Sequence, residues 1–202
     1  MTLAATRGRG RPRSDAAERA IVDAALDLLA EGVGASAVTV SEIARRAGVG
    51  KDTVYRRWRS KDDLLVAALG SLYGSYDQHV DGPIREVLIA RLAELVARMY
   101  DERNQRIYRS VLTGCAEQPE LRERFYAEVI QPRRDATRVV IGAAIERGEL
   151  DPATDPALLG SLLFAPVLAQ AFESRPQRHL RGAPRAVATR IVDAALRGAL
   201  PR

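Results

Sequence analysis

The side chains of this sequence with the clearest chemistry lie together in one short polar segment. Lys51 could donate to O6 or N7 of guanine or to a phosphate, and Thr53 could hydrogen-bond either a base or the backbone. Asp52 could accept a hydrogen bond from cytosine, but a carboxylate here could also help to cap a helix, which we favour. The groups one turn later, a hydroxyl and two guanidinium groups, could bind phosphates: Tyr55, Arg56 and Arg57. The chemistry that this segment offers is the recognition of DNA.

Other kinds of site have little support in the sequence. The segment GVGKDT resembles a phosphate-binding loop, but it lacks the first glycine of that motif and has Asp52 where Ser or Thr is needed. The two histidines, His79 and His179, lie too far apart for a local metal site, and a single cysteine, Cys115, excludes an internal disulfide. No nucleophile elbow or metal-ligand spacing is present. We therefore expect no catalytic residue, metal or cofactor, and no enzymatic activity.

The charge of the chain is unevenly distributed. The chain has 202 residues and a net charge of +5, and its first 61 residues hold 12 Lys and Arg against 7 Asp and Glu. The excess positive charge therefore belongs to the first third, which indicates a polyanionic partner for that part. Apolar residues make up 47% of the sequence and aromatic residues only 5%, which favours an aliphatic core between packed helices.

The sequence predicts neither export nor a membrane span. The first ten residues lack the apolar core of a signal peptide. The longest apolar run, 157–172, includes polar residues and is shorter than the roughly 20 residues that a bilayer requires. We expect a cytoplasmic protein in which this run forms a buried helix.

The first third predicts a group of short helices. Ser14 is a suitable N-cap for a first helix, which Gly32 should end. A second helix should begin at Val40, because Thr39 and Glu42 have the spacing of a capping box.

A tight turn separates the second helix from a third. Gly48 permits the positive φ of such a turn, and Val49 and Val54 are spaced to fill the core between the two helices. The third helix should run from Lys51 to about Trp58, with Trp58 as a core anchor rather than a base-stacking group. Two short helices joined in this way, with another helix ahead of them, match a helix-turn-helix unit. The second helix of such a unit presents its N-terminal residues to the major groove of DNA.

The rest of the chain predicts further helices. Ser60 should cap a fourth helix. The later helical stretches are predicted at about 84–101, 104–117, 120–147, 156–174 and 184–198. Pro132 and Pro166 lie inside two of these and should kink or split them. Because no stretch has the alternating pattern of a strand, the sequence predicts an all-α fold.

Residues 39–65, TVSEIARRAGVGKDTVYRRWRSKDDLL, closely resemble the DNA-binding segment of the TetR family of bacterial transcriptional regulators. The features that carry the resemblance are Thr39-Val40, Ile43-Ala44, Ala47-Gly48-Val49, Thr53, Tyr55, Trp58 in place of the usual phenylalanine, and Ser60-Lys61 followed by acids and leucines. The resemblance implies that Thr39, Tyr55 and Lys61 contact phosphates and that the start of the third helix reads bases. Gly50 stands where a serine is common, which removes one hydroxyl contact.

The same resemblance implies an architecture and an activity. Residues 14–62 would form an N-terminal helix-turn-helix domain of three helices. Residues 63–202 would form a larger helical domain that binds a ligand and forms a homodimer through about 156–174 and 184–198. The chain would be a sequence-specific repressor, released from a near-palindromic operator by a small apolar or amphipathic effector. Two alternatives remain open: a constitutive or architectural DNA-binding protein without an effector, and a helical interaction or enzyme module whose basic N-terminus is incidental.

The effector pocket would be lined by side chains in the interior of the second domain. Tyrosine hydroxyls beside aliphatic walls would suit an apolar ligand with one or two polar groups. The candidate lining residues are Met99, Tyr100, Tyr108, Leu112, Phe125, Tyr126 and Phe164.

The first 13 residues are rich in glycine and arginine and predict a flexible arm. Its segment RGRGRPR ends directly before the first helix. Arginines separated by glycines fit a narrow minor groove, whose negative potential attracts them, and Gly10-Arg11-Pro12 resembles an AT-hook. We expect the arm to contact DNA, with Arg9 and Arg11 entering the groove.

Overall fold

The structure is a computed structural model that describes residues 11–73, 82–169 and 180–197. Within these ranges the chain forms helices and turns and no strands, which confirms the predicted all-α fold. In chain order the helices are α1 (Arg11–Ala30), α2 (Val40–Arg46), α3 (Lys51–Tyr55), α4 (Lys61–Ser71), α5 (Ile84–Tyr100), α6 (Glu102–Glu117), α7 (Pro119–Phe125), the π-helix η1 (Tyr126–Ile130), α8 (Gln131–Glu146), α9 (Pro156–Ala169) and α10 (Pro184–Leu196).

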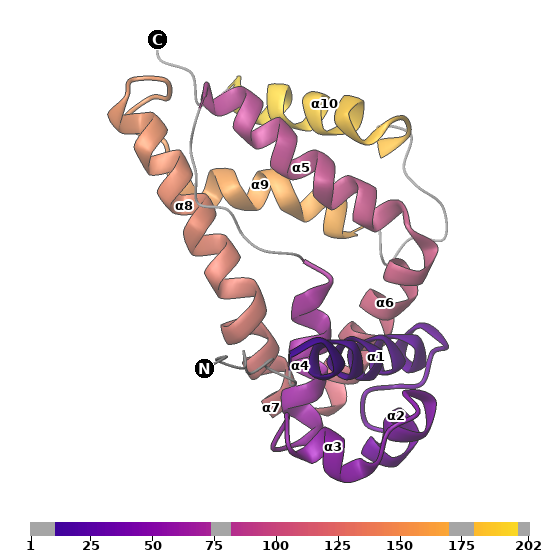
Figure 1. The fold of residues 1–202 in the computed structure, drawn as a ribbon. Coiled ribbons are helices and arrows are strands. Elements are labelled where there is room, and N and C mark those ends of the chain that lie inside the picture. Colours follow the sequence, from indigo (N-terminus) through magenta and orange to yellow (C-terminus); the bar gives the residue numbers. More distant parts are fainter. Residues whose placement is uncertain (1–10, 74–81, 170–179, 198–202) are drawn as a thin grey trace, which may run out of the picture.

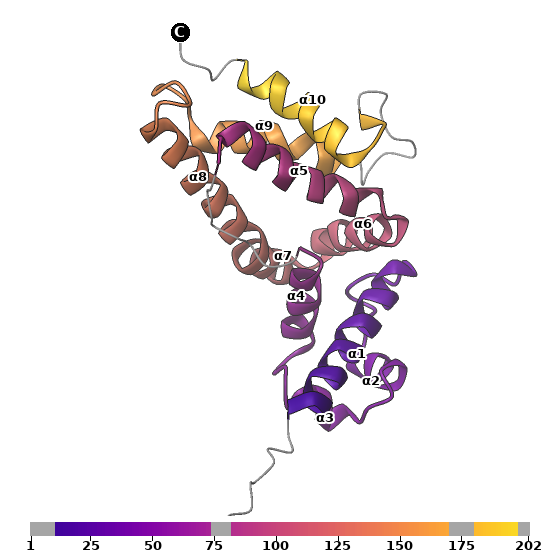
Figure 2. The same cartoon turned by 45° about the horizontal axis from the view of Figure 1, so that its top comes forward.

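The helices gather at two ends of the molecule. In Figure 1, α5, α9 and α10 lie together at one end, and α1 to α4 form the other. The helices α6 and α8 run between these ends on opposite sides. Figure 2, turned by 45°, shows the same separation, with α3 at the end far from α10.

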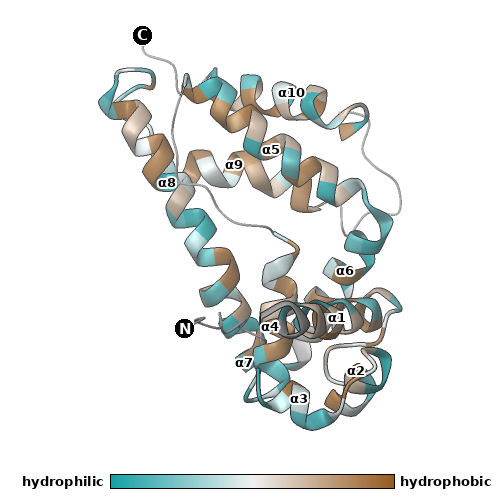
Figure 3. Cartoon of the chain, viewed as in Figure 1, coloured by the Kyte–Doolittle hydropathy of each residue, from teal (hydrophilic) through white to brown (hydrophobic). Residues whose placement is uncertain are grey.

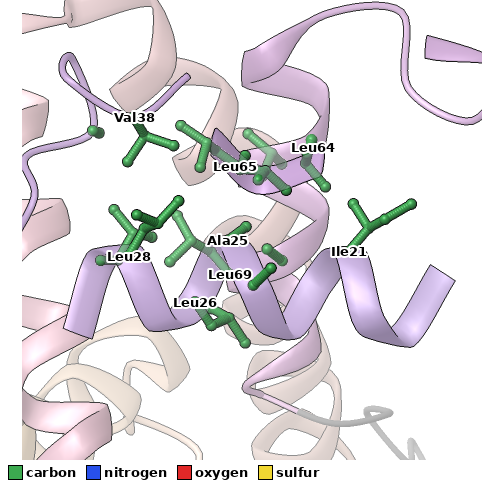
Figure 4. Packing of buried hydrophobic residues seen from close by; sticks show 14 of the residues in the cluster. Ile21, Ala25, Leu26, Leu28, Val38, Leu64, Leu65 and Leu69 are labelled. Atoms are coloured by element: carbon green, nitrogen blue, oxygen red, sulfur yellow. The ribbon is translucent and has the colours of Figure 1, made fainter. Parts of the chain in front are cut away.

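One hydrophobic core holds α1 to α4 together. Its fully buried side chains include Ile21 and Leu29 of α1, Ile43 of α2, and Leu64 and Leu65 of α4. Figure 4 shows aliphatic side chains of α1 and α4 lying side by side. They can do so because apolar residues recur every three or four positions on one face of each helix. This first core also includes side chains from later helices, namely Ile107, Val111, Leu121, Phe125 and Val129.

A second core joins α5, α8, α9 and α10. Its fully buried side chains include Leu88 and Leu92 of α5, Ile141 of α8, and Val187 and Val192 of α10. Figure 3 shows that α9 is mostly hydrophobic, whereas α5 and α10 carry residues of both kinds. Among the helices in the described ranges, none is long and apolar enough to cross a membrane.

The first helix begins earlier than the sequence predicts. It starts at Arg11 instead of following an N-cap at Ser14, so the last part of the predicted flexible arm is helical. Pro12 is compatible with this start, because a proline in the first turn lacks only an N–H that has no partner within the helix.

The turn between α2 and α3 has the geometry that the sequence predicts. The N–H of Gly48 donates to the carbonyl oxygen of Arg45 (3.3 Å), and the N–H of Val49 donates to that of Ala44 (3.0 Å). Gly48 has a φ of 66°, in the left-handed region that favours glycine. These two hydrogen bonds form a Schellman motif, which satisfies the last carbonyl groups of α2. Gly32 ends α1 in the same way.

The predicted helix 120–147 is divided by a π-helical turn. The helix α7 is followed by η1 and then by α8. The N–H of Gln131 donates to the carbonyl oxygen of Tyr126, five residues earlier, which is the π-helical pattern. Pro132 follows directly and has no N–H to donate, so the widened turn lies where the kink is expected. Pro166, by contrast, lies inside α9 without dividing it.

The other helix boundaries follow the sequence closely. The helix α4 begins with a capping box, in which Ser60 Oγ accepts from the N–H of Asp63 and the Asp63 carboxylate accepts from the N–H of Ser60. The helices α5, α9 and α10 begin at the predicted residues. Among the boundaries that differ, α3 ends at Tyr55 rather than near Trp58, and α6 begins at Glu102 rather than at about 104.

Candidate nucleic-acid interface

The start of α2 is fixed by Thr39. Thr39 is the N-cap, and its hydroxyl oxygen accepts from the N–H of Glu42 (3.2 Å). The predicted capping box is only half formed, because the Glu42 carboxylate binds Arg45 (2.7 Å) and Arg46 (2.9 Å) instead. Charged guanidinium groups are stronger donors to a carboxylate than a backbone amide. These hydrogen bonds lower the pKa of Glu42 to about 2.

Arg46 also connects α2 to the end of α1. Its guanidinium group donates to both carboxylate oxygens of Glu31, at 2.5 and 2.7 Å. This hydrogen bonding lowers the pKa of Glu31 as well. A bidentate contact of this kind restricts orientation as well as distance, so it holds α2 in a defined position against α1.

The outer side of α3 is polar and exposed. Its N-cap is Gly50, which makes no side-chain hydrogen bond, and Asp52 lies in the first turn. Asp52 is therefore not the N-cap, although its charge there is favourable for the helix dipole. Lys51 is exposed, Thr53 is partly exposed, and Tyr55 has 53% of its surface exposed. These side chains are available to a ligand outside the protein.

The inner side of α3 is buried in the first core. Val54 is 1% exposed, and Trp58 in the turn after the helix is 9% exposed. The prediction that Trp58 is a core anchor is confirmed. Arg57 donates from Nη1 to the carbonyl oxygen of Thr53 (3.0 Å), so part of its guanidinium group is engaged within the turn. Arg56 is exposed.

Lys61 has a structural contact that the sequence did not indicate. Its Nζ donates to the carbonyl oxygens of Ala35 (3.0 Å) and Ser36 (3.2 Å). Both carbonyls belong to the connection between α1 and α2, so Lys61 attaches this connection to the start of α4. An ammonium group has three N–H donors, which leaves a third one for a phosphate.

Most of the predicted DNA-binding residues lie at one end of the molecule. Thr39 begins α2, and the others follow in α3 and the turn after it, at the lower end in Figure 1. Arg9 lies outside the described residues. Arg11 belongs to α1 rather than to a flexible arm, because the helix extends through it, and its side chain is also outside the description. Arg59 is a further exposed cation at this end of the molecule that is not among the predicted DNA-binding residues, although its place in the basic run YRRWR is a usable signal.

The residues predicted to line an effector pocket are divided between the cores and the surface. Met99 is 5% exposed in the second core, and Phe164 packs against that core. Phe125 belongs to the first core. Tyr100 and Tyr126 are 37% and 42% exposed, so the prediction that they lie in the interior is wrong.

The exposure of these two tyrosines has a local cause. Tyr100 is the last residue of α5 and donates its hydroxyl to the carbonyl oxygen of Leu180. Tyr126 is the first residue of η1, where the α-helical spacing changes, and its hydroxyl accepts from Arg134 (2.8 Å). Of the remaining candidates, Tyr108 packs against the second core.

Several residues considered from the sequence lie outside the description. They are His79 and His179, and the side chains of Leu112 and Cys115. Among the described residues, no group of His, Cys, Asp and Glu side chains could hold a metal ion.

Family models match both parts of the chain. Residues 21–68 match the model described as bacterial regulatory proteins, tetR family. Residues 81–195 match the model described as tetracyclin repressor-like, C-terminal domain. The first match includes α2 and α3, and the second includes the helices of the second core.

Individual proteins show the same similarity over most of their length. The uncharacterized HTH-type transcriptional regulator YdeS of Bacillus subtilis is 30% identical over 159 residues, which are 79% of this chain and 80% of that protein. The fold is similar to that of NalD, the secondary repressor of the MexAB-OprM multidrug efflux pump in Pseudomonas aeruginosa, with a TM-score of 0.69, 22% identity and coverage of 93% and 97% of the two chains. It is also similar to that of the transcriptional regulator FadR from Bacillus subtilis in complex with stearoyl-CoA, with a TM-score of 0.66, 19% identity and coverage of 89% and 98%.

Proposed function

This chain belongs to the TetR family of bacterial transcriptional regulators, which bind DNA, and we propose that it inserts α3 into the major groove of an operator. The observation that carries this proposal is the two-sided character of α3. Its outer side is polar and exposed, whereas Val54 and the following Trp58 anchor its inner side in the first core. A short helix held in this way can present side chains to base edges without losing its own position.

The exposed residues of α3 have distinct roles in this proposal. Lys51 reaches a guanine or a phosphate from the first turn, while Tyr55 and Arg56 bind phosphates. Thr39 can donate its hydroxyl hydrogen to a phosphate, because its oxygen already accepts from Glu42. A Cβ atom built on Gly50 would meet nothing within 4 Å of the protein, so the glycine leaves open space at the start of α3 for the DNA backbone.

A homodimer would place two α3 helices on one operator. Leu158 and Leu162 of α9 are 58% and 54% exposed, and Ala165 one turn later is also exposed. This apolar stripe lies on the side of α9 opposite the buried Leu159 and Leu163, and a second subunit would cover it. Two-fold symmetry would then separate the α3 helices by about 34 to 36 Å, which corresponds to successive major grooves of a near-palindromic site.

We propose that the regulator represses transcription and that a small molecule releases it from DNA. The similarity to the repressor NalD and to FadR in complex with stearoyl-CoA supports this proposal. A route for the signal exists in α6, which contacts α1 directly. Arg103 donates to Asp27 (2.7 Å), and Arg106 donates to the carbonyl oxygen of Ala30 (3.1 Å). A ligand that favours another position of α6 would therefore also shift α1 and the helices packed on it.

Operator binding is tested by selecting bound fragments from genomic DNA and measuring their affinity by fluorescence anisotropy. Replacing Lys51 by alanine should alter the sequence preference, by roughly 1 to 3 kcal/mol at the base pair that it contacts. Replacing Tyr55 by phenylalanine should weaken binding to all sequences alike. Glu146→Gln, at the exposed end of α8, serves as the control. Unchanged binding and preference in Lys51→Ala would contradict the proposed role of α3.

The dimer is tested separately by analytical ultracentrifugation of Leu162→Asp. A charge in the apolar stripe should yield monomers that bind a single operator half-site weakly. A Leu162→Asp protein that stays dimeric and keeps its operator affinity would place the interface elsewhere. An operator affinity that no small molecule changes would favour the alternative of a constitutive DNA-binding protein.

A further inference from the structure

Two tyrosines and two arginines from four parts of the chain meet between the two cores. We call them the Tyr73 cluster: Tyr73 directly after α4, Arg98 of α5, Tyr108 of α6 and Arg133 of α8. The guanidinium carbon of Arg133 lies 4.7 Å from the centre of the Tyr73 ring. The Tyr73 ring also lies beside the ring of Phe125, and the centres of the two rings are 6.4 Å apart. In Figure 1 the end of α4 points into the region that α5, α6 and α8 surround.

Two polar atoms of this cluster are buried without a well-formed hydrogen bond. Neither Tyr73 Oη nor Arg98 Nε makes a hydrogen bond of ordinary geometry to the residues that the structure describes, and the Tyr73 hydroxyl has only the neighbouring Tyr108 hydroxyl to interact with. Folded proteins pair the great majority of buried polar atoms, because an unpaired one loses its hydrogen bonds to water without replacement. Two such atoms in one cluster therefore indicate an occupant that supplies hydrogen-bond acceptors.

The chemistry of the cluster specifies the charge of that occupant. Burial raises the pKa of Tyr73 and of Tyr108, so both hydroxyls keep their protons and can donate. Arg98 has a long ion pair with Glu94, whose Oε2 is 3.8 Å from Arg98 Nη1 and whose side chain is 73% exposed. Arg133 donates to the carbonyl oxygens of Val129 and Gly70, which hold its guanidinium group against Tyr73. Protonated hydroxyls beside guanidinium groups form a set of donors that fits an oxyanion.

We propose that the Tyr73 cluster binds the anionic head group, a carboxylate or a phosphate, of an organic acid whose apolar part packs against the neighbouring core side chains. This inference rests on the proposed release by a small molecule and names the class of that molecule. Apolar residues lie around the cluster, since Phe125 contacts Tyr73 and Tyr108 packs against the second core. A ligand with one charged end and an apolar body matches both surroundings.

The position of Tyr108 connects this site to the DNA-binding helices. Tyr108 lies on α6 between Arg106 and Ser110, which donate to the carbonyl oxygens of Ala30 and Val33 at 3.1 Å each. A ligand that draws Tyr108 toward the anion would therefore act on the segment of α6 that contacts the end of α1.

The first test compares three probes that share one apolar chain: dodecanoate, dodecyl phosphate and dodecanol. Binding to the full-length protein is measured by isothermal titration calorimetry. At least one anionic probe should bind about tenfold or more tightly than dodecanol, because charge-assisted hydrogen bonds are the stronger ones. The better of the two anionic probes identifies the head group as carboxylate or phosphate. Equal affinity for dodecanol, or no binding of either anion, would overturn the proposal.

The second test removes single donors from the site. Tyr73→Phe keeps the ring against Phe125 and Arg133, and Arg98→Met keeps an apolar side chain of similar length without the charge. Both variants should bind the better anionic probe about tenfold or more weakly and bind dodecanol unchanged. Tyr100→Phe removes a hydroxyl from α5 outside the cluster and should bind like the wild type.

A purely structural role for the Tyr73 hydroxyl gives a different result. Removing a hydroxyl that makes a well-formed hydrogen bond within the protein would destabilise the ligand-free protein, whereas removing a buried hydroxyl without such a bond would not. We therefore expect the ligand-free Tyr73→Phe protein to melt at or above the wild-type temperature. Wild-type affinity of this variant for the anions would overturn the assignment.

Anisotropy with operator DNA separates this inference from the proposed function. If anions bind at the cluster and leave operator affinity unchanged, the anion site is supported and the proposed release from DNA is contradicted. If dodecanol releases the protein from the operator and the anions do not bind, release by a small molecule is supported and the anion site is contradicted.

Discussion

The two hydrophobic cores of this chain differ in how far apart in the sequence their helices lie. The first core takes most of its side chains from α1 to α4, which follow one another directly. The second core combines α5 with α8, α9 and α10. The pairing of α5 with α10 includes a hydrogen-bonded contact between Arg85 and Asp193 (2.7 Å), which are 108 positions apart. The first core therefore depends on local signals such as caps and turns, whereas the second depends on contacts between distant helices.

The two cores are nevertheless connected. Ile107 of α6 and Leu121 of α7 belong to the first core, although both helices follow α5 in the chain. Leu64 and Leu65 also belong to it, so this core extends beyond residue 62, the predicted end of the DNA-binding domain. A change in either core should consequently affect the stability of the other.

The largest expected effect tests this connection directly. Leu65→Ala in the first core and Leu163→Ala in the second should each lower the free energy of unfolding by about 2 to 5 kcal/mol, because each leaves a cavity in a packed core. Chemical denaturation at a fixed protein concentration is followed by Trp58 fluorescence, which reports the first core, and by circular dichroism, which reports all helices. Both probes should give one transition. Separate transitions in Leu163→Ala would show that the cores unfold independently.

A smaller effect tests the local signals of the first core. Gly48→Ala should cost about 1 to 2 kcal/mol of stability, because its φ of 66° is strained for any residue with a Cβ atom. Gly50→Ser is the matched control in the same turn. Gly50 has a φ of −74° and open space around it, so a serine N-cap should be neutral or stabilise by a few tenths of a kcal/mol. Equal losses in the two variants would mean that φ at Gly48 is not the determinant.

Lys61 allows stability and DNA binding to be measured at one residue. Lys61→Ala should lower the free energy of unfolding by about 1 kcal/mol, since two hydrogen bonds to the connection between α1 and α2 are lost. If its third N–H neutralises a phosphate, the slope of log affinity against log salt should also fall by about one unit. A loss of stability with an unchanged slope would assign Lys61 a purely structural role.

The smallest effect concerns the ion pairs that hold α2. Hydrogen bonds from Arg45 and Arg46 lower the pKa of Glu42 from its usual value of 4.5 to about 2. A carboxylate whose pKa is lower in the folded protein stabilises the fold above its unfolded pKa, and this contribution disappears as the pH falls toward 2. Glu42→Gln should therefore flatten the decrease in unfolding free energy between about pH 4.5 and pH 2. Identical pH profiles for Glu42→Gln and the wild type would show that these exposed ion pairs contribute nothing measurable.

The sequence predicts most of the first core and little of the Tyr73 cluster. Thr39 and Gly48 act within a few residues, so their spacing alone indicates where α2 begins and ends. The contact from Lys61 to the connection after α1 spans 25 or 26 positions and has no signature in the local pattern. The proximity of Tyr73 and Arg98 has no local signature either, because it depends on how separate helices pack. The interior placement of Tyr126 is wrong because Tyr126 directly follows the buried Phe125, and one helical step of about 100° turns its side chain away from the first core.

The π-helical turn η1 also changes which side of the α7–η1–α8 segment faces each core. Each residue turns an α-helix by about 100°, and a turn with five-residue hydrogen bonds inserts one extra residue into that rotation. Before η1, Leu121 faces the first core, and after it, Val140 and Ile141 face the second. The nearly continuous helical segment α7–η1–α8 can thus pack one side against the first core and another side against the second core. A deletion of a single residue within η1 would restore an unbroken α-helical phase, at the cost of rotating Thr137 of α8 away from Gly160 of α9, where its methyl group lies 3.3 Å from the position of a Cβ.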